Sequence, residues 1–179
     1  LVQEKNVLDV FARKVKRLRK AFRASEVTGR AAISTQSATG LPNVPDESID
    51  YVFTDPPFGS NIMYSEGSFL WESWLRVFTN ATPEAIINDT QGKDLDAYRR
   101  LMTQSFGEMY RILKPGRWIT VVFHNSKAAV WNAIQEALSR AGFLVAQVTV
   151  MDKQQGSFKQ VTSAGAVKND LVISAYKPR

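Results

Sequence analysis

Hydrophobic and polar positions follow two different periods along this chain. Apolar residues recur every three or four positions in four segments, which predicts helices over residues 7–22, 64–78, 94–113 and 128–141. Shorter apolar runs predict strands over residues 31–35, 49–53, 118–123, 143–151 and 170–176. Strands that alternate with helices are typical of α/β folds with an open, mostly parallel sheet and helices on both faces. Only a loop joins the last two strands, so we expect one C-terminal strand to be antiparallel.

Charge divides the chain into a basic arm (residues 1–28) and a neutral body (residues 29–179). Residues 1–23 hold eight Lys or Arg and two acidic residues, which accounts for the whole net charge of +6. The arm pattern predicts an amphipathic helix, and its cations suit a nucleic-acid backbone. The candidate phosphate contacts are Arg13, Lys16, Arg17 and Lys20. A solvated helix face or a linker explains the same charges equally well.

Composition removes several classes of site. The chain has no cysteine and one histidine, His124, so a disulfide, a thiolate zinc site and a multi-histidine metal site are excluded. No apolar run is long enough to span a membrane, and no signal peptide is visible. We therefore expect a cytoplasmic, metal-independent protein.

One short segment carries the strongest chemical signal. The predicted strand 49–53 leads directly into Thr54-Asp55-Pro56-Pro57-Phe58, followed by Gly59-Ser60-Asn61. Ligands of open α/β sheets bind at the carboxyl ends of the strands, where this segment lies. The two prolines stiffen the turn and leave carbonyl groups without neighbouring donors. A carboxylate, a free carbonyl and an aromatic ring together suit a flat base with an exocyclic amino group.

The same residues admit a plainer interpretation, in which a proline turn ends a strand and Phe58 only packs. The surrounding sequence favours the chemical interpretation. Asp55 and the Pro56 carbonyl would accept both amino hydrogens, which exposes the nitrogen lone pair to an electrophilic methyl group.

Asp55-Pro56-Pro57-Phe58 resembles the catalytic motif of amino-group DNA methyltransferases, which methylate adenine N6 or cytosine N4. Residues 41–52 resemble the family's approach to the motif, and residues 59–71 resemble large bacterial adenine-specific methylases. Residues 110–116, followed by an apolar strand, resemble the helix–turn–strand shared by class I methyltransferases. The resemblance covers residues 31–177. It implies a class I methyltransferase, Rossmann-like fold, S-adenosyl-L-methionine as cofactor, and double-stranded DNA with a flipped base as partner.

By this resemblance, Asp55 and Pro56 hold the target amino group, Pro57 stiffens the turn and Phe58 stacks on the base. Gln36, Ser37 and Ala38 fall where the family contacts the cofactor, and Asp55 borders the same site. Here Gln36-Ser37 replaces the family's usual Gly-Asp pair. The family's glycine-rich loop (Asp/Phe-x-Gly-x-Gly) and its ribose-binding acid are missing. We therefore expect an incomplete cofactor half, with that loop before Leu1 or after Arg179 in the full protein.

Further residues near the motif are candidates for the base pocket. They are Gly59, Ser60, Asn61, Tyr64 and His124. For His124 and the adjacent Asn125, helix capping is the competing explanation. Trp71 and Trp74 are expected in the core.

Adenine N6 is the leading target. Cytosine N4, an RNA base or a protein glutamine remain alternative targets, and a non-enzymatic nucleic-acid-binding fragment remains an alternative function.

Overall fold

The computed structural model describes residues 6–24, 29–60, 62–125, 127–151 and 170–179. These residues form two compact units, Leu1–Thr35 and Gln36–Arg179. No helix among them combines the length and apolarity needed to cross a membrane.

The first unit contains helix α1 (Val7–Ala24), which confirms the helix expected in the basic arm. The Asn6 side chain accepts a hydrogen bond from the Leu8 amide (2.9 Å) and so caps the helix start. Its apolar stripe and the basic residues Arg13, Lys16, Arg17 and Lys20 lie on opposite sides of the helix. The strand expected over residues 31–35 is wrong, since this segment forms no strand and Ile33 is 96% exposed. No described strand pairs with this short run.

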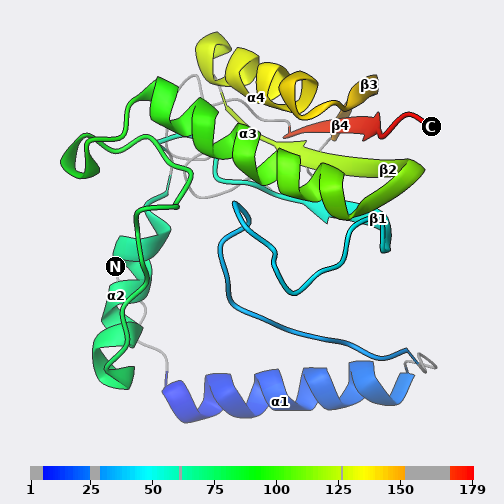
Figure 1. Ribbon diagram of the computed structural model, residues 1–179. Coiled ribbons are helices and arrows are strands. Elements are labelled where there is room, and N and C mark those ends of the chain that lie inside the picture. The colour runs from blue at the N-terminus through cyan, green and yellow to red at the C-terminus, as the bar shows by residue number, and fades with distance from the viewer. Residues whose placement is uncertain (1–5, 25–28, 61, 126, 152–169) are drawn as a thin grey trace. The chain divides into compact units, whose positions relative to one another are not determined.

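The second unit is built on a four-stranded sheet with the order β1-β2-β4-β3 (Figure 1). Strands β1 and β2 are parallel, and β4 is antiparallel to both β2 and β3. Three strands therefore share one direction, and only the C-terminal strand opposes them. This confirms the mostly parallel sheet with one antiparallel C-terminal strand. The bounds are β1 (Ile49–Thr54), β2 (Leu113–Phe123), β3 (Leu144–Met151) and β4 (Asp170–Tyr176).

Two helices cover one face of this sheet, α3 (Leu95–Ile112) and α4 (Ala128–Ala141). Every second residue at the end of β2 (Ile119, Val121 and Phe123) is fully buried against them. On the opposite face Tyr51, Phe53 and Trp118 are exposed. Among the described elements of this unit, helices thus cover one face of the sheet rather than the two that we expected.

Helix α2 (Tyr64–Leu75) follows the motif, and the short helix η1 (Asp89–Gln91) follows later in the connecting segment. Trp71 is 69% exposed and Trp74 is 84% exposed, so the prediction that both belong to the core is wrong. The polar side of α2 is the side that is held, because Ser65 donates to Glu84 and Glu66 accepts from Asn88. The helical period indicated an apolar stripe but not which surface covers it.

Candidate active site

Strand order brings three separate parts of the chain to one edge of the sheet. Thr54 at the end of β1 pairs with Val121 near the end of β2. Phe123 at the end of β2 pairs with Leu171 at the beginning of β4. Since β4 is antiparallel, its first residue lies where β1 and β2 end. Asp55, His124 and Asp170 therefore share this edge, where α/β sheets bind their ligands.

The residues of the motif turn (residues 55–60) differ in exposure. Asp55 is exposed, Pro56 and Gly59 are buried, and Phe58 is half-buried. The Phe58 ring meets the Phe123 ring edge to face, with 5.4 Å between their centroids, and lies 6.0 Å from the His124 ring. Phe58 thus packs on the core, as the plainer interpretation required, while the residue as a whole stays partly exposed.

Three successive carbonyl groups of the motif turn accept hydrogen bonds from the protein behind it. The Pro57 oxygen accepts from the Tyr98 hydroxyl (2.7 Å), and the Phe58 oxygen accepts from Asn125 Nδ2 (2.8 Å). The Gly59 oxygen accepts from the Ile87 amide (3.2 Å). No described residue donates to the Pro56 carbonyl. The Pro56 oxygen is therefore an acceptor that a bound molecule could use.

Close packing explains the glycine at the end of the motif turn. Gly59 has a φ of 73°, in the left-handed region that other residues avoid. A Cβ atom there would lie 3.2 Å from Val130 Cγ1 and 3.4 Å from Asn125 Nδ2. Gly59 is thus needed for the approach of the turn to α4, rather than only for the approach of a ligand.

Tyr64, another base-pocket candidate, lies close enough to Asp55 for the two groups to interact electrostatically. Partial burial raises the pKa of the Tyr64 phenol, and the nearby Asp55 carboxylate raises it further. Ser60 is exposed at the end of the turn. Asn61 lies outside the described residues.

His124 has a partner that sequence reasoning missed. Its Nδ1 atom lies 3.0 Å from Oδ1 of Asp170, whose side chain is almost completely buried. Asp170 directly precedes an apolar strand, and only the antiparallel direction of that strand brings the carboxylate to this edge. Tyr98 was also missed, since one buried tyrosine on a helix gives no signal in the sequence.

The cofactor candidates Gln36, Ser37 and Ala38 belong to a segment that is fixed before β1. The Ser37 hydroxyl lies 2.8 Å from the Thr39 hydroxyl in a local turn, and Ala38 packs on the core. Neither contact tests a cofactor role, so that assignment stays a prediction.

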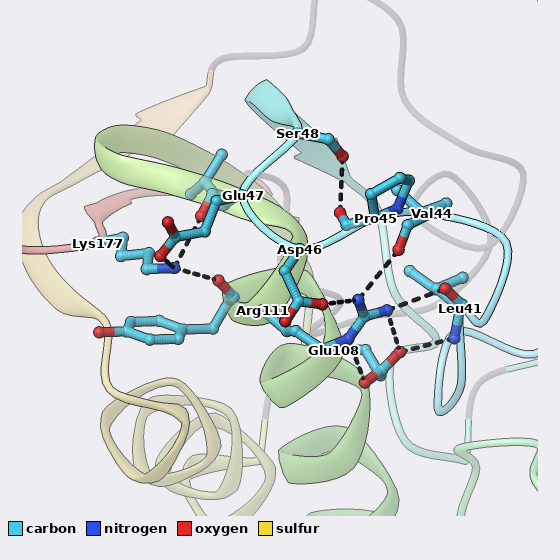
Figure 2. A network of polar contacts seen from close by, with 11 residues as sticks. Leu41, Val44, Pro45, Asp46, Glu47, Ser48, Glu108, Arg111 and Lys177 are labelled. Carbon is cyan, nitrogen blue, oxygen red and sulfur yellow. Dashed lines mark hydrogen bonds and ion pairs between the residues drawn. The ribbon is translucent and has the colours of Figure 1, made fainter.

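Residues 41–48, which precede β1, are called the anchor segment. A network of charged side chains holds this segment on α3 (Figure 2). Glu108 accepts from the Leu41 amide (2.7 Å), and Arg111 donates to the Leu41 oxygen (2.9 Å) and the Val44 oxygen (3.0 Å). Arg111 also pairs with Glu108 and Asp46. Arg111, and then the Leu41 amide, hold the pKa of the Glu108 carboxyl below its usual value.

A comparison with known proteins identifies the family of this chain. Residues 49–178 match the family model described as DNA methylase, of the N6 and N4 amino-group type. The chain belongs to this DNA methylase family. No curated protein matches it in sequence.

Solved structures resemble this DNA methylase chain at low identity. One, from Thermus thermophilus, is described as a DNA modification methylase. It shares 16% identity over 75% of this chain and 47% of its own, with a TM-score of 0.46. Another, a SAM-dependent methyltransferase from Methanosarcina mazei, shares 14% identity over 92% of this chain and 77% of its own, with a TM-score of 0.49. The chain thus spans about half the length of the Thermus methylase.

Proposed function

We propose that this chain forms the base-binding, catalytic part of a methyltransferase that modifies an exocyclic amino group of DNA, namely adenine N6. The observation that supports this function most directly is the arrangement of acceptors in the motif turn. Asp55 is exposed at the carboxyl end of β1, and the adjacent Pro56 carbonyl accepts no hydrogen bond from the described residues. Two adjacent acceptors match the two hydrogens of an amino group.

The motif residues act on the amino nitrogen through hydrogen bonds. When Asp55 and the Pro56 carbonyl accept both hydrogens, the nitrogen lone pair is drawn out of conjugation with the ring. The partly exposed Phe58 stacks on the base, which must first leave the duplex to reach a turn at the sheet edge. Tyr64 and the His124–Asp170 pair border this position. The chain's own contribution is thus to orient and polarise the amino group.

The methyl donor is S-adenosyl-L-methionine, which supplies an electrophilic methyl group on a sulfonium. The residues of this chain fit the side of the reaction that accepts the methyl group. They do not make up a complete donor site, because the sequence has no Asp/Phe-x-Gly-x-Gly loop. The Ser37 hydroxyl is already engaged with Thr39, and Ala38 is packed on the core. These local contacts do not test a role toward the donor, so Gln36, Ser37 and Ala38 stay candidates for cofactor contacts.

The partner is double-stranded DNA. The basic side of α1, with Arg13, Lys16, Arg17 and Lys20, supplies cations for the phosphate backbone. Backbone contacts of this kind position a protein without reading the base sequence. Cytosine N4 is the second candidate target, because the same two acceptors would hold its amino group.

A transfer assay with the full-length protein, labelled S-adenosyl-L-methionine and DNA tests this proposal. Replacing Asp55 with Ala is expected to lower methyl transfer at least about a hundredfold while DNA binding is kept. Asp50→Ala is the matched control, since this exposed aspartate lies at the other end of β1 and pairs with Lys114. If the wild type transfers no methyl group to any nucleic acid but still binds it, the non-enzymatic alternative holds.

A further inference from the structure

The Tyr98 hydroxyl is a buried polar group whose position points to a role in the motif turn. Tyr98 is fully buried on α3, and its hydroxyl donates to the Pro57 oxygen at 2.7 Å. Burial raises the pKa of the Tyr98 phenol, while a hydrogen bond with the Gly59 backbone opposes this shift. The hydroxyl therefore stays protonated and remains a donor at any physiological pH. A phenylalanine would fill the same space, so the core itself does not require this oxygen.

Asn125 supplies the second donor, and its orientation is determined by its other contact. Its Oδ1 atom accepts from the Lys127 amide (2.7 Å) just before α4, and its Nδ2 atom donates to the Phe58 oxygen (2.8 Å). The Lys127 amide can only donate, so it fixes which end of the Asn125 amide group faces the motif. The side chain thus connects the beginning of α4 to the motif turn.

We propose that Tyr98 and Asn125 are positioning residues for methyl transfer. By drawing the Pro57 and Phe58 carbonyls inward, they set the rotation of the peptide units next to Asp55 and Pro56. That rotation decides whether the Asp55 carboxylate and the Pro56 oxygen converge on one amino group. Both donors are neutral, so they orient the turn without adding a charge beside Asp55. This inference rests on the proposed function of the motif.

Isosteric substitutions separate positioning from simple folding. In the full-length protein, Tyr98→Phe is expected to lower kcat about tenfold or more, because small displacements of reacting groups are costly. Its KM for DNA should stay within about twofold of wild type, since the residue does not touch DNA. Asn125→Asp should lower kcat further than Asn125→Ala, because it places a carboxylate against the Phe58 carbonyl.

Tyr110→Phe is the matched control. It removes a hydroxyl from the same helix, in a residue whose ring packs on Phe143 rather than on the motif turn. Its kcat should equal that of the wild type. Amide hydrogen exchange of residues 58–60 is the second measurement, and it should accelerate in Tyr98→Phe and stay unchanged in Tyr110→Phe.

The outcomes distinguish this inference from the proposed function. If the wild type methylates DNA and Tyr98→Phe keeps its kcat, the positioning role is overturned. The same holds if Tyr98→Phe and Tyr110→Phe lose equal activity. An inactive wild type would instead overturn the proposed function. Hydrogen exchange would then decide the geometric part, because unchanged exchange at residues 58–60 in Tyr98→Phe would show that the hydroxyl does not hold the turn.

Discussion

The two irregular segments that flank β1 are held in opposite ways. The anchor segment before the strand is bound by charged side chains, Arg111, Glu108 and Lys177 (Figure 2). The motif turn after the strand is bound by the neutral donors Tyr98 and Asn125 and by a backbone amide. Both segments contact α3, but at positions ten residues apart, or about 15 Å along the helix.

The difference places the charges of the anchor network away from the proposed reaction. The two sets of contacts lie about 15 Å apart along α3, which exceeds the screening length of physiological salt, so we expect the anchor network to exert little field on the motif turn. The neutral donors near Asp55 keep their hydrogen bonds over a wide range of pH. If this comparison is right, substitutions and pH should affect the two segments separately.

The largest effect is expected at Gly59, where the motif turn has no spare space. Gly59→Val puts a branched side chain at a φ of 73° and against Val130, and should lower the free energy of unfolding by about 3 kcal/mol. Urea unfolding measures the loss. Gly107→Ala is the control, since nothing lies within 4 Å of the added Cβ on α3, and it should be neutral or stabilising. Equal stability of the Gly59→Val variant and the wild type would contradict the close packing of the turn.

A smaller loss of unfolding free energy is expected when the buried cation that holds the anchor segment is removed. Lys177 is 7% exposed and donates to Glu47, the Tyr110 oxygen and the Leu113 oxygen. Lys177→Met leaves two carbonyls without this donor and should cost about 2 kcal/mol of unfolding free energy. Hydrogen exchange should rise in residues 41–48 and not in residues 55–60.

Lys114→Met is the comparison variant for this prediction, because Lys114 pairs with Asp50 on the surface and should contribute little. If Lys177→Met loosens the motif turn as much as the anchor segment, the two regions are one cooperative unit and the comparison fails.

The sequence predicted most of the sheet and the position of the motif, because both follow from local rules. The period of apolar residues defined β1, α3 and α4, and the two prolines marked the turn after the strand. It did not predict partners that lie far apart along the chain. Tyr98 and Asp170 join the site through a helix packing and a strand direction, neither of which leaves a local pattern. The prediction for Trp71 and Trp74 was wrong because the period of apolar residues indicates an apolar helix face but not whether another part of the protein packs on that face.

The smallest expected effect is a pH dependence confined to the anchor segment. Arg111 and the Leu41 amide lower the pKa of Glu108 in the folded protein below the unfolded value near 4.5. The carboxylate therefore stabilises the fold above that value, and its contribution is lost as the pH falls through the folded pKa. Intrinsic-rate-corrected hydrogen exchange of the Leu41 amide should accelerate in this acid range. The amides of residues 58–60 should not share this response to Glu108, because neutral groups donate to the carbonyls of the turn.

Glu108→Gln tests the cause of this response. The amide keeps an oxygen for the Leu41 amide but has no charge to lose, so exchange at Leu41 should become independent of acid in the same range. A variant that retains the wild-type pH response would assign it to another carboxyl, for which Asp46 beside Arg111 is the next candidate. An acid response at residues 58–60 that disappears in Glu108→Gln would be the sharper contradiction. It would mean that the charge of Glu108, about 15 Å away along α3, affects the hydrogen bonds of the motif turn although neutral groups donate them.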